Sequence, residues 1–376
     1  MASVNKRPNG RWRARYRDEA GKEHARHFDR KVDAQRWLDE VTASVVTGQY
    51  VDPSSGRMTF GQYAAAWADR QVWVPRTLIG HNLAVRSTTF CDMELRKIRP
   101  SHVEQWVKRM RDGDPTEQEP RKLAASTIAT RFNHVRAVFR AAVRDRQIAA
   151  DPSANVVLPR QRRRASAMVI PAGDQVGRLV QAGGDRFGVF VALCAFAGLR
   201  LGEAAAVQVG DIDFLRRTLH VRRQVQLVDK TRVDIRAPKY GSERDVYLPA
   251  ELVTMLAEQV SGLGPGGTER WLFERAPGEP YHQNVVTWLW RATRKRAAVT
   301  GVRLHDLRHF YASGLIAAGC DVVTVSRALG HASATTTLSI YAHLWPTAED
   351  RTRQAAAGMM SDALRRADSR RTASSG

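Results

Sequence analysis

The chain of 376 residues contains only three cysteines, Cys91, Cys194 and Cys320, and they are far apart in the sequence. Such scattered thiols predict neither a disulfide framework nor a thiolate metal site. Long apolar runs are also missing. The longest uncharged one, 187–199, is too short to cross a bilayer, and the first residues lack a signal-peptide core. We therefore expect a cytosolic protein.

Patterns typical of nucleotide-dependent and metal-dependent enzymes are missing as well. There is no G-x-x-x-x-G-K-[ST] loop for ATP and no carboxylate cluster for magnesium. The stretch "HDLRH" at 305–309 has the histidine spacing of the zinc-protease helix H-E-x-x-H. However, Asp306 replaces its glutamate, and Arg308 would repel a dication. We expect no metal and no cofactor.

Acidic residues are fewer than basic ones, 38 against 59, which leaves a net charge of +21. This imbalance attracts polyanions over long range. A membrane surface is the competing polyanion, but neither a basic amphipathic helix nor a lipidation signal is evident. Nucleic acid is therefore the expected partner.

The N-terminal segment alternates basic and apolar residues in "RWRARYRD", which is the period of a strand. We expect a turn over 18–23, a returning strand over 24–28, and an amphipathic helix over 32–46 that covers the apolar face. A positive ribbon of this width fits a DNA groove, although it is also compatible with a solvated strand face. Its basic residues are Arg11, Arg13, Arg15 and Arg17.

A linker rich in Gly, Pro and Ser at 48–58 precedes a helical region. Ser101 and Glu104 predict a capping box, and Ser126 predicts the cap of a longer helix that ends near residue 146. Three arginines at four-residue spacing on that helix suit the tracking of phosphates, or form only a solvated face. They are Arg136, Arg140 and Arg144.

The clearest boundary is "DPSANVVLPRQRRRASAM" at 151–168. A flexible basic connector would let two flanking domains close around a duplex, with its arginines on the DNA backbone. These arginines are Arg160, Arg162, Arg163 and Arg164. The following region predicts an apolar helix over 187–198, a strand over 218–228, a strand–turn–strand over 236–249, and helices from about 282 to 365.

Six residues of this last region suit the binding and cleavage of a phosphodiester. Fixed guanidiniums hold two phosphate oxygens at once, and a tyrosine hydroxyl of pKa about 10 serves as a nucleophile if it is activated. Departure of a sugar alkoxide needs a proton donor, for which Lys239 and His305 are both candidates. His309 is interpreted as a packing or hydrogen-bonded histidine. The six residues are Arg200, Lys239, His305, Arg308, His331 and Tyr341.

Four motifs carry a resemblance to a known family: "AGLRLGEAAAV", "PKYGSERDVYLP", "LHDLRHFYAS" and "LGHASATTTLSIYAH". Together, and in this order, they resemble the tyrosine recombinases, in particular integrases of temperate phages and integrative elements that carry an extra N-terminal arm-binding domain. The motifs span about 200–343. Tyr311 departs from the pattern, since the family usually has a small polar residue there.

The resemblance implies roles for the matching residues. Arg200 and Arg308 would clamp the phosphate, Tyr341 would attack it, and Lys239 would be the general acid. The supporting residues would be His305 and His331, as proton-handling or phosphate-bonding groups, and Glu203. The product would be a 3′-phosphotyrosine, whose stored bond energy makes ligation independent of ATP.

The resemblance also implies an organisation and partners. We expect an α+β, mainly α fold. The N-terminal part would comprise an arm-binding sheet and helix at 1–56 and a helical core-binding (SAM-like) domain at 57–158. A basic linker at 159–168 would lead to a mostly helical catalytic domain with a small antiparallel sheet at 169–365, followed by a disordered tail at 366–376. The partners would be double-stranded attachment sites of core and arm types, three further copies of the chain, and possible host DNA-bending and excisionase proteins, in the bacterial cytoplasm. A type IB topoisomerase and a non-catalytic DNA-binding regulator stay open as alternatives.

Overall fold

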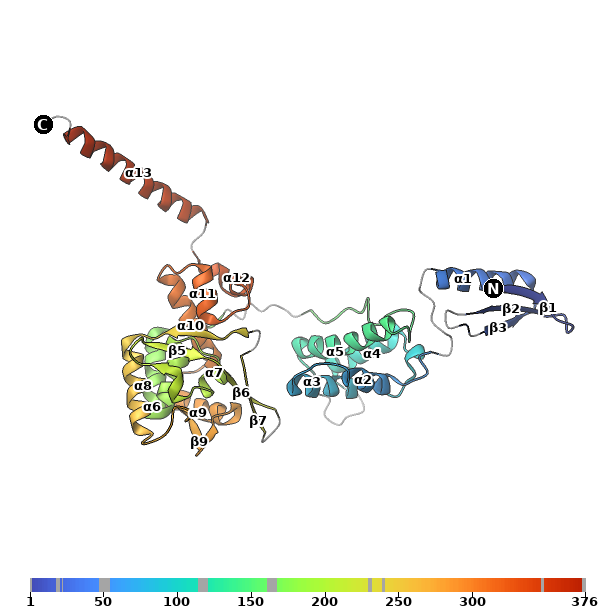
Figure 1. The fold of residues 1–376 in the computed structure, drawn as a ribbon, viewed down its shortest axis with the longest axis horizontal. Helices are drawn as coiled ribbons and strands as arrows, with labels where there is room; N and C mark the ends of the chain where they lie inside the picture. Colours follow the sequence, from blue (N-terminus) through green and yellow to red (C-terminus); the bar gives the residue numbers. More distant parts are fainter. Residues whose placement is uncertain are drawn as a thin grey trace. The chain divides into compact units, whose positions relative to one another are not determined.

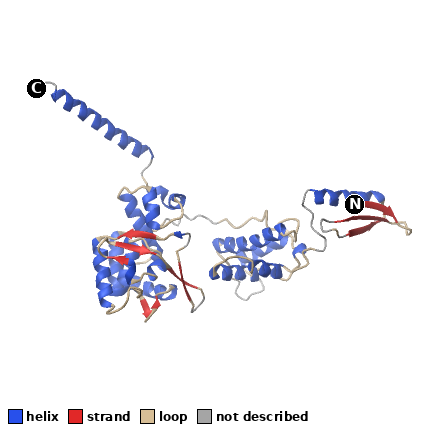
Figure 2. Cartoon of the chain, in the orientation of Figure 1, coloured by secondary structure: helices blue, strands red, loops and turns tan. Residues whose placement is uncertain are grey.

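The computed structural model describes residues 2–17, 21, 23–46, 55–113, 121–160, 168–228, 232–238, 241–345 and 348–373. The chain divides into two compact units, Met1–Arg164 and Ala165–Gly376. This division falls inside the basic connector expected at 159–168. Helices predominate among the described elements, and the strands form small sheets (Figure 2).

The first unit begins with an antiparallel sheet of order β1-β2-β3, formed by β1 (Ser3–Lys6), β2 (Trp12–Arg17) and β3 (Glu23–Phe28). Helix α1 (Lys31–Val46) contacts all three strands (Figure 1). Ala14 and Tyr16 of β2 are buried against Leu38 of α1, because alternate residues of a strand face the same side. The hairpin and helix were expected, whereas β1 was not.

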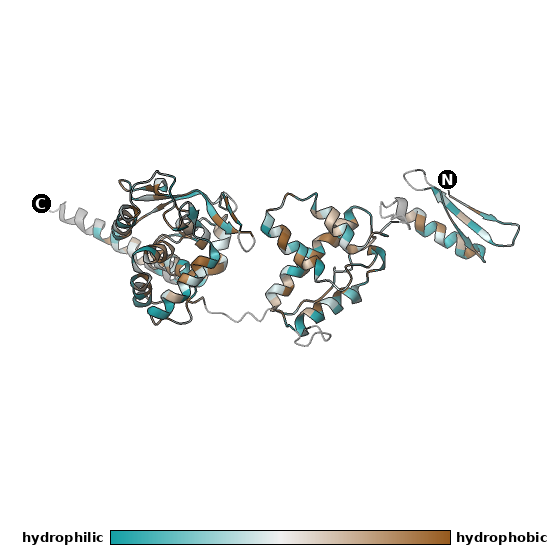
Figure 3. Cartoon of the chain, turned by 90° about the horizontal axis from the view of Figure 1, so that it is seen from below, coloured by the Kyte–Doolittle hydropathy of each residue, from teal (hydrophilic) through white to brown (hydrophobic). Residues whose placement is uncertain are grey.

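The rest of the first unit is a helical bundle of α2 (Phe60–Ala68), α3 (Pro75–Arg86), α4 (Pro100–Asp112) and α5 (Ala125–Arg144), with a 3₁₀ turn at Leu95–Lys97. Helix α5 contacts the other three helices, and its residue Phe139 packs on Phe60 and Phe90 at their centre. Both apolar and polar residues occur along each of these helices, as expected for amphipathic helices that bury one face (Figure 3).

Two expected helix caps are wrong. Helix α4 begins at Pro100, and the backbone N–H of Arg99 donates to Nδ1 of His102 at 3.0 Å. Proline fits the first helical position because its fixed φ suits the helix and its missing N–H has no partner there. This places the expected Ser101 cap inside the helix. Helix α5 likewise begins before Ser126, with Ala124 as an N-cap that makes no side-chain bond.

The core of the second unit is built around α6 (Gly173–Phe196), which breaks at Gly184, where φ is +65°. After the break, residues 187–195 are buried against α8 (Ala250–Gly262), α9 (Gln283–Arg296) and α10 (Leu304–Ala317). By length and composition α6 is the one described helix that would be able to cross a membrane, yet it is the central core helix of this unit.

Small sheets and further helices complete this unit. A sheet of order β4-β5-β8 contains β4 (Ile212–Asp213), β5 (Thr218–Val221) and β8 (Arg244–Tyr247), while β6 (Gln224–Leu227) pairs with β7 (Val233–Arg236) and β9 (Glu274–Ala276) with β10 (Glu279–Pro280). The helices still to be named are α7 (Leu201–Ala205), α11 (Val322–Leu329), α12 (Ala334–Tyr341) and α13 (Ala348–Ala373), with 3₁₀ turns at Val209–Asp211 and Ala342–Leu344.

Two expected boundaries differ from the structure. The single strand expected over 218–228 is broken after Val221, and Arg223 donates to the buried carboxylate of Asp211 at 2.6 Å instead of continuing the sheet. Helix α13 crosses the boundary expected at residue 365 and continues to Ala373, because "DALRRADSRRTA" contains neither Pro nor Gly.

Candidate active site

The start of α10 is held by an aspartate that the zinc-protease pattern would make catalytic. Asp306 is fully buried, accepts the backbone N–H of Arg303 at 2.7 Å, and pairs with the Arg303 guanidinium at 2.9 Å. Its carboxylate therefore stabilises the helix N-terminus. No group of three or more His, Cys, Asp or Glu able to hold a metal occurs in the described part of the chain.

Arg308 lies two residues after Asp306 on α10 and is only 2 % exposed. Its Nη1 donates to the carbonyl of Gly198 at 2.6 Å, and its Nη2 donates to the carbonyl of Leu329. Burial, followed by the charge of Arg200, lowers the pKa of Arg308 to about 9, so the guanidinium stays protonated at neutral pH. Among the described residues, carbonyls are its hydrogen-bond acceptors, and a buried cation held in this way has capacity left for an anion.

Arg200 is the N-cap of α7, and Glu203 lies in the first turn of that helix. The Arg200 Nη1 donates to Oε1 of Glu203 at 2.6 Å, and its Nη2 donates to the carbonyl of Gly330 at 3.2 Å. The side chain of Arg200 is 37 % exposed, in contrast with buried Arg308. The guanidinium is therefore held at both terminal nitrogens while part of the side chain remains accessible.

Glu203 is buried between two guanidiniums, those of Arg200 and Arg244. Arg244, on β8, donates to Oε2 of Glu203 at 2.9 Å and to the carbonyl of Ala328 at 2.9 Å. Burial raises the pKa of Glu203, but the charges and hydrogen bonds of Arg244 and then Arg200 outweigh it and hold the pKa at about 2. The carboxylate thus links α7 to β8 and, through Arg244, to the end of α11.

Two glycines allow these arginines to reach backbone carbonyls. Gly198 and Gly330 both have positive φ, +64° and +60°. A Cβ on Gly198 would lie 2.3 Å from the ring of Tyr311, and one on Gly330 would lie 2.7 Å from Nη1 of Arg244. Only glycine suits both the conformation and the space. The bulky Tyr311, which departs from the family pattern, therefore packs directly beneath the turn that carries Arg200.

His331 follows Gly330 directly and is half-buried. Its Nδ1 is 2.8 Å from Oγ1 of Thr337, a fully buried residue of α12. Burial, then the charges of Arg308 and Arg200, lowers the pKa of His331 to about 4. The ring is therefore neutral at pH 7, and the hydrogen bond to Thr337 fixes its orientation.

Tyr341 ends α12 and is 1 % exposed. Its hydroxyl is hydrogen-bonded to Nδ1 of His309 at 2.7 Å, and the two rings meet edge to face. Burial raises the pKa of Tyr341 to about 12, against the opposing effect of Arg308 and Arg200. The phenol is thus protonated at rest, within electrostatic range of both guanidiniums.

His305 lies on the same helix as Arg308 and His309. Its ring is perpendicular to that of His309, with centroids 5.0 Å apart. Burial among its neighbours, then the charges of His309 and Arg308, lowers the pKa of His305 to about 4. The residue as a whole is exposed, so water screens part of this effect. It is the member of the group most open to an incoming ligand.

Five of the six residues expected to act on phosphate thus lie in one network. Lys239 is outside the described residues, between β7 and β8. Sequence reasoning missed Arg244, although "RDVY" places it on the same strand face as buried Val246. It also missed the contact between His309 and Tyr341, which no spacing rule predicts.

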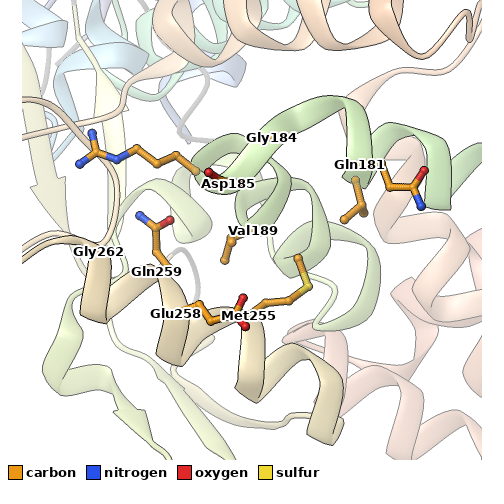
Figure 4. A pocket seen from close by; sticks show the side chains of 10 residues that line it. Gln181, Gly184, Asp185, Val189, Met255, Glu258, Gln259 and Gly262 are labelled. Carbon is orange, nitrogen blue, oxygen red and sulfur yellow. The ribbon is translucent and has the colours of Figure 1, made fainter.

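Two of the hollows in the described part of this unit bear on the location of the site. One, of about 540 Å³, borders the network between β8 and α11, and its lining includes Ser242, Arg327 and His331. The other, of about 720 Å³, lies between the break in α6 and helix α8 (Figure 4). Its lining mixes Asp185 and Glu258 with apolar residues and includes no member of the network.

The arginines expected at the N-terminal sheet lie on the face opposite α1. Arg13 and Arg15 both pair with Glu23, at 3.1 and 3.7 Å. Arg11 pairs with an exposed aspartate at 2.9 Å, and Arg17 donates to a backbone carbonyl at 3.4 Å. Exposed pairs of this kind are worth about 0–1 kcal/mol, so a DNA phosphate would readily replace the carboxylate.

The arginines of α5 differ in exposure. Arg136 is half-buried, and its Nε has no hydrogen-bond partner among the described residues, whereas Arg140 and Arg144 are exposed. Neither Arg140 nor Arg144 forms an ion pair with another described residue. Arg160 is exposed, and the expected Arg162, Arg163 and Arg164 lie outside the described residues.

Comparison with known proteins agrees with this geometry. Residues 172–347 match the model of the phage integrase family, and residues 2–47 match that of the phage integrase N-terminal domain. A putative prophage phiRv2 integrase of Mycobacterium tuberculosis is 27 % identical over 87 % of each chain. A tyrosine recombinase XerD of Bifidobacterium longum is 32 % identical over 59 % of this chain and 73 % of its own.

Two solved structures share the fold. The Tn1549 transposon integrase in complex with transposon right end DNA matches with a TM-score of 0.65 at 18 % identity, over 81 % of this chain and 100 % of that one. A lambda integrase tetramer bound to a Holliday junction matches with a TM-score of 0.56 at 18 % identity, over 88 % and 96 %. The chain belongs to the tyrosine recombinase family of phage integrases. The expected enzyme class and the α+β, mainly α fold are thereby confirmed.

Proposed function

We propose that the chain integrates and excises a phage or mobile element by cutting DNA with Tyr341 at a phosphate clamped by Arg200 and Arg308. One observation carries this assignment. The two guanidiniums, from residues 108 positions apart, donate to the adjacent carbonyls of Leu329 and Gly330, and both are electrostatically coupled to the Tyr341 phenol. Three distant segments thus bring two cations and a nucleophile into one network of the second unit.

The clamp would act mainly on the transition state. Negative charge grows on the nonbridging oxygens during phosphoryl transfer, and guanidiniums already oriented by carbonyls need little reorganisation to bind it. Glu203 keeps Arg200 in place, and His331, oriented by Thr337, would donate a hydrogen bond to the same phosphate. Lys239, in the segment of sequence between β7 and β8, would protonate the departing 5′-oxygen.

The bond energy is conserved in this scheme. The phenolic oxygen of Tyr341 forms a bond to phosphorus as the bond to the 5′-oxygen breaks, leaving a 3′-phosphotyrosine and a 5′-hydroxyl. A 5′-hydroxyl from a second DNA site would then reverse the step and complete strand exchange. The reaction therefore needs no ATP.

The first unit would place the enzyme on its DNA sites. The cationic face of β2 would bind arm-type sites and the exposed arginines of α5 would track the core-site backbone. Deletion of residues 1–56 should spare cleavage of core sites and abolish integration. Full integration by the truncated chain would refute the arm-binding assignment.

Strand exchange between two sites needs four subunits, and the lambda integrase structure on a Holliday junction is a tetramer. We infer that this chain also assembles as a homotetramer on two attachment sites, in the bacterial cytoplasm. Host DNA-bending and excisionase proteins would be accessory partners.

A covalent trap tests the proposal. The full-length protein is incubated with a nicked duplex that carries its attachment core, denatured, and separated by electrophoresis. Wild type should form a protein–DNA adduct and Tyr341→Phe should form none. Lack of an adduct in wild type would favour the DNA-binding regulator. Relaxation of supercoiled plasmid that lacks attachment sites would favour the topoisomerase alternative.

A further inference from the structure

One contact of the site has no role in the mechanism above. The ring of His309 is half-buried between His305 and Tyr341, and its Nδ1 lies 2.7 Å from the phenolic oxygen. This distance is at the short end for a hydrogen bond between nitrogen and oxygen. Because Tyr341 is otherwise enclosed, His309 is the one side chain among the described residues whose hydrogen bond with the hydroxyl is observed.

The direction of this hydrogen bond follows from the protonation states. Burial raises the pKa of Tyr341 to about 12, so its oxygen carries the proton. Burial also lowers the pKa of His309, outweighing the opposite effect of Asp306, while Arg303 and Arg308 act with burial. A neutral imidazole facing a protonated phenol accepts at Nδ1 and carries its own hydrogen on Nε2.

Adjacent residues of a helix point to different sides, so neighbouring side chains of α10 contact different parts of the site. Arg308 donates to backbone carbonyls on the clamp side, whereas His309 meets the nucleophile. The same turn of helix therefore holds the phosphate-binding cation and a base in direct contact with the reacting oxygen. His305 flanks the ring edge to face, and Asp306 is occupied by the helix cap.

We propose that His309 is the general base that takes the proton of Tyr341. As the phenolic oxygen bonds to phosphorus and the 5′-oxygen departs with a proton from the general acid, the phenolic proton moves to Nδ1 of His309, which becomes imidazolium. In religation the departing phenolic oxygen recovers this proton. The inference rests on the proposed role of Tyr341 as nucleophile.

The first test separates proton acceptance from positioning. His309→Asn places an amide oxygen near the position of Nδ1, so it keeps an acceptor for the hydroxyl but takes up no proton. Single-turnover adduct formation is measured for wild type, His309→Asn and His309→Ala, with His220→Asn, a histidine of β5 outside the site, as matched control. General base catalysis contributes about 100-fold or more, so both His309 variants should slow by at least this factor.

Near-wild-type cleavage by His309→Asn would overturn the proposal, because a hydrogen bond alone would then suffice. Faster cleavage by either variant would overturn it in favour of a contact that restrains the tyrosine. Circular dichroism melts of each variant show whether the chain still folds. Wild type that forms no adduct would instead refute the proposed function itself.

A second measurement uses chemical rescue, which a misfolded variant would not show. A substrate with sulfur in place of the 5′-bridging oxygen has a leaving group that needs no proton. It should restore cleavage by Lys239→Ala but not by His309→Asn. Conversely, 3,5-difluorotyrosine at position 341, with a more acidic phenol, should restore His309→Asn in large part. Rescue of His309→Asn by the sulfur substrate, or no rescue by the fluorinated tyrosine, would overturn the assignment.

Discussion

Replacing Glu203 by glutamine tests whether the buried carboxylate holds the clamp together. The residue is 3 % exposed and lies between the guanidiniums of Arg200 and Arg244. Its pKa falls from 4.5 to about 2, a shift that corresponds to about 3 kcal/mol of folding free energy. Glutamine keeps the shape but removes the charge, leaving three cations, including Arg308, without a counterion. We expect a loss of about 3 kcal/mol at pH 7.

The pH dependence of this loss has a definite sign. A carboxylate whose pKa is lower in the folded state stabilises it fully above about pH 4.5, and the contribution disappears as pH falls towards 2. The difference between wild type and Glu203→Gln should therefore shrink to under about half by pH 3. A loss of stability that did not come from the Glu203 charge would not change with pH over this range.

The assay must isolate the catalytic unit, since a chain of two units does not unfold in one step. Hydrogen–deuterium exchange of peptides from the buried half of α6, measured over a urea series, reports the opening free energy of that unit alone. Glu258→Gln, on the exposed side of α8, is a matched control and should change it by less than about 0.5 kcal/mol. An equally small effect for Glu203→Gln, or one independent of pH between 3 and 7, would refute the reasoning.

Three further substitutions test other contacts of the site. Arg244→Lys should not replace Arg244. Its three guanidinium nitrogens donate to Glu203 and to the carbonyls of Ser242 and Ala328, whereas the three donors of an ammonium share one nitrogen and do not reach all three acceptors at once. Single-turnover cleavage should therefore fall about tenfold or more while DNA binding in gel shifts is retained, and wild-type cleavage would contradict this. Gly198→Ala should destabilise the catalytic unit by about 2 kcal/mol or more in urea unfolding. The control is Gly301→Ala, where φ is also positive but an added Cβ meets no atom, and it should cost about 1 kcal/mol. Equal losses would exclude the predicted clash at Gly198. Thr337→Val keeps the packing but frees His331, so cleavage should slow with no change in melting temperature, and an unchanged rate would show that this hydrogen bond is dispensable.

Much of the fold was predictable where one local pattern sufficed. The alternation of Arg13 and Arg15 with Ala14 and Tyr16 correctly predicted a strand with one buried face. Local caps failed where a stronger constraint was present, as at Pro100, whose ring determines where α4 begins. The strand β1 also escaped prediction, since its four residues carry too little pattern.

The residues of the site also fall into those that a local sequence pattern predicts and those that it does not. Arg200, Arg308 and Tyr341 were found through sequence motifs, and the structure brings them together. The contacts that organise them depend on the fold: Arg244 reaches Glu203 across 41 positions, and His309 reaches Tyr341 across 32. No local period encodes such distances, because they arise from where the fold places β8 relative to α7 and α12 relative to α10.

The most direct test of the account is to map the covalent bond. After trapping with a nicked attachment-site duplex labelled at one end, the adduct is digested with protease and nuclease, and the modified peptide is sequenced by mass spectrometry. The account predicts a nucleotide joined through its 3′-phosphate to Tyr341, and loss of the adduct when Arg308 is replaced by alanine. A nucleotide on any other residue, or undiminished adduct without Arg308, would contradict it.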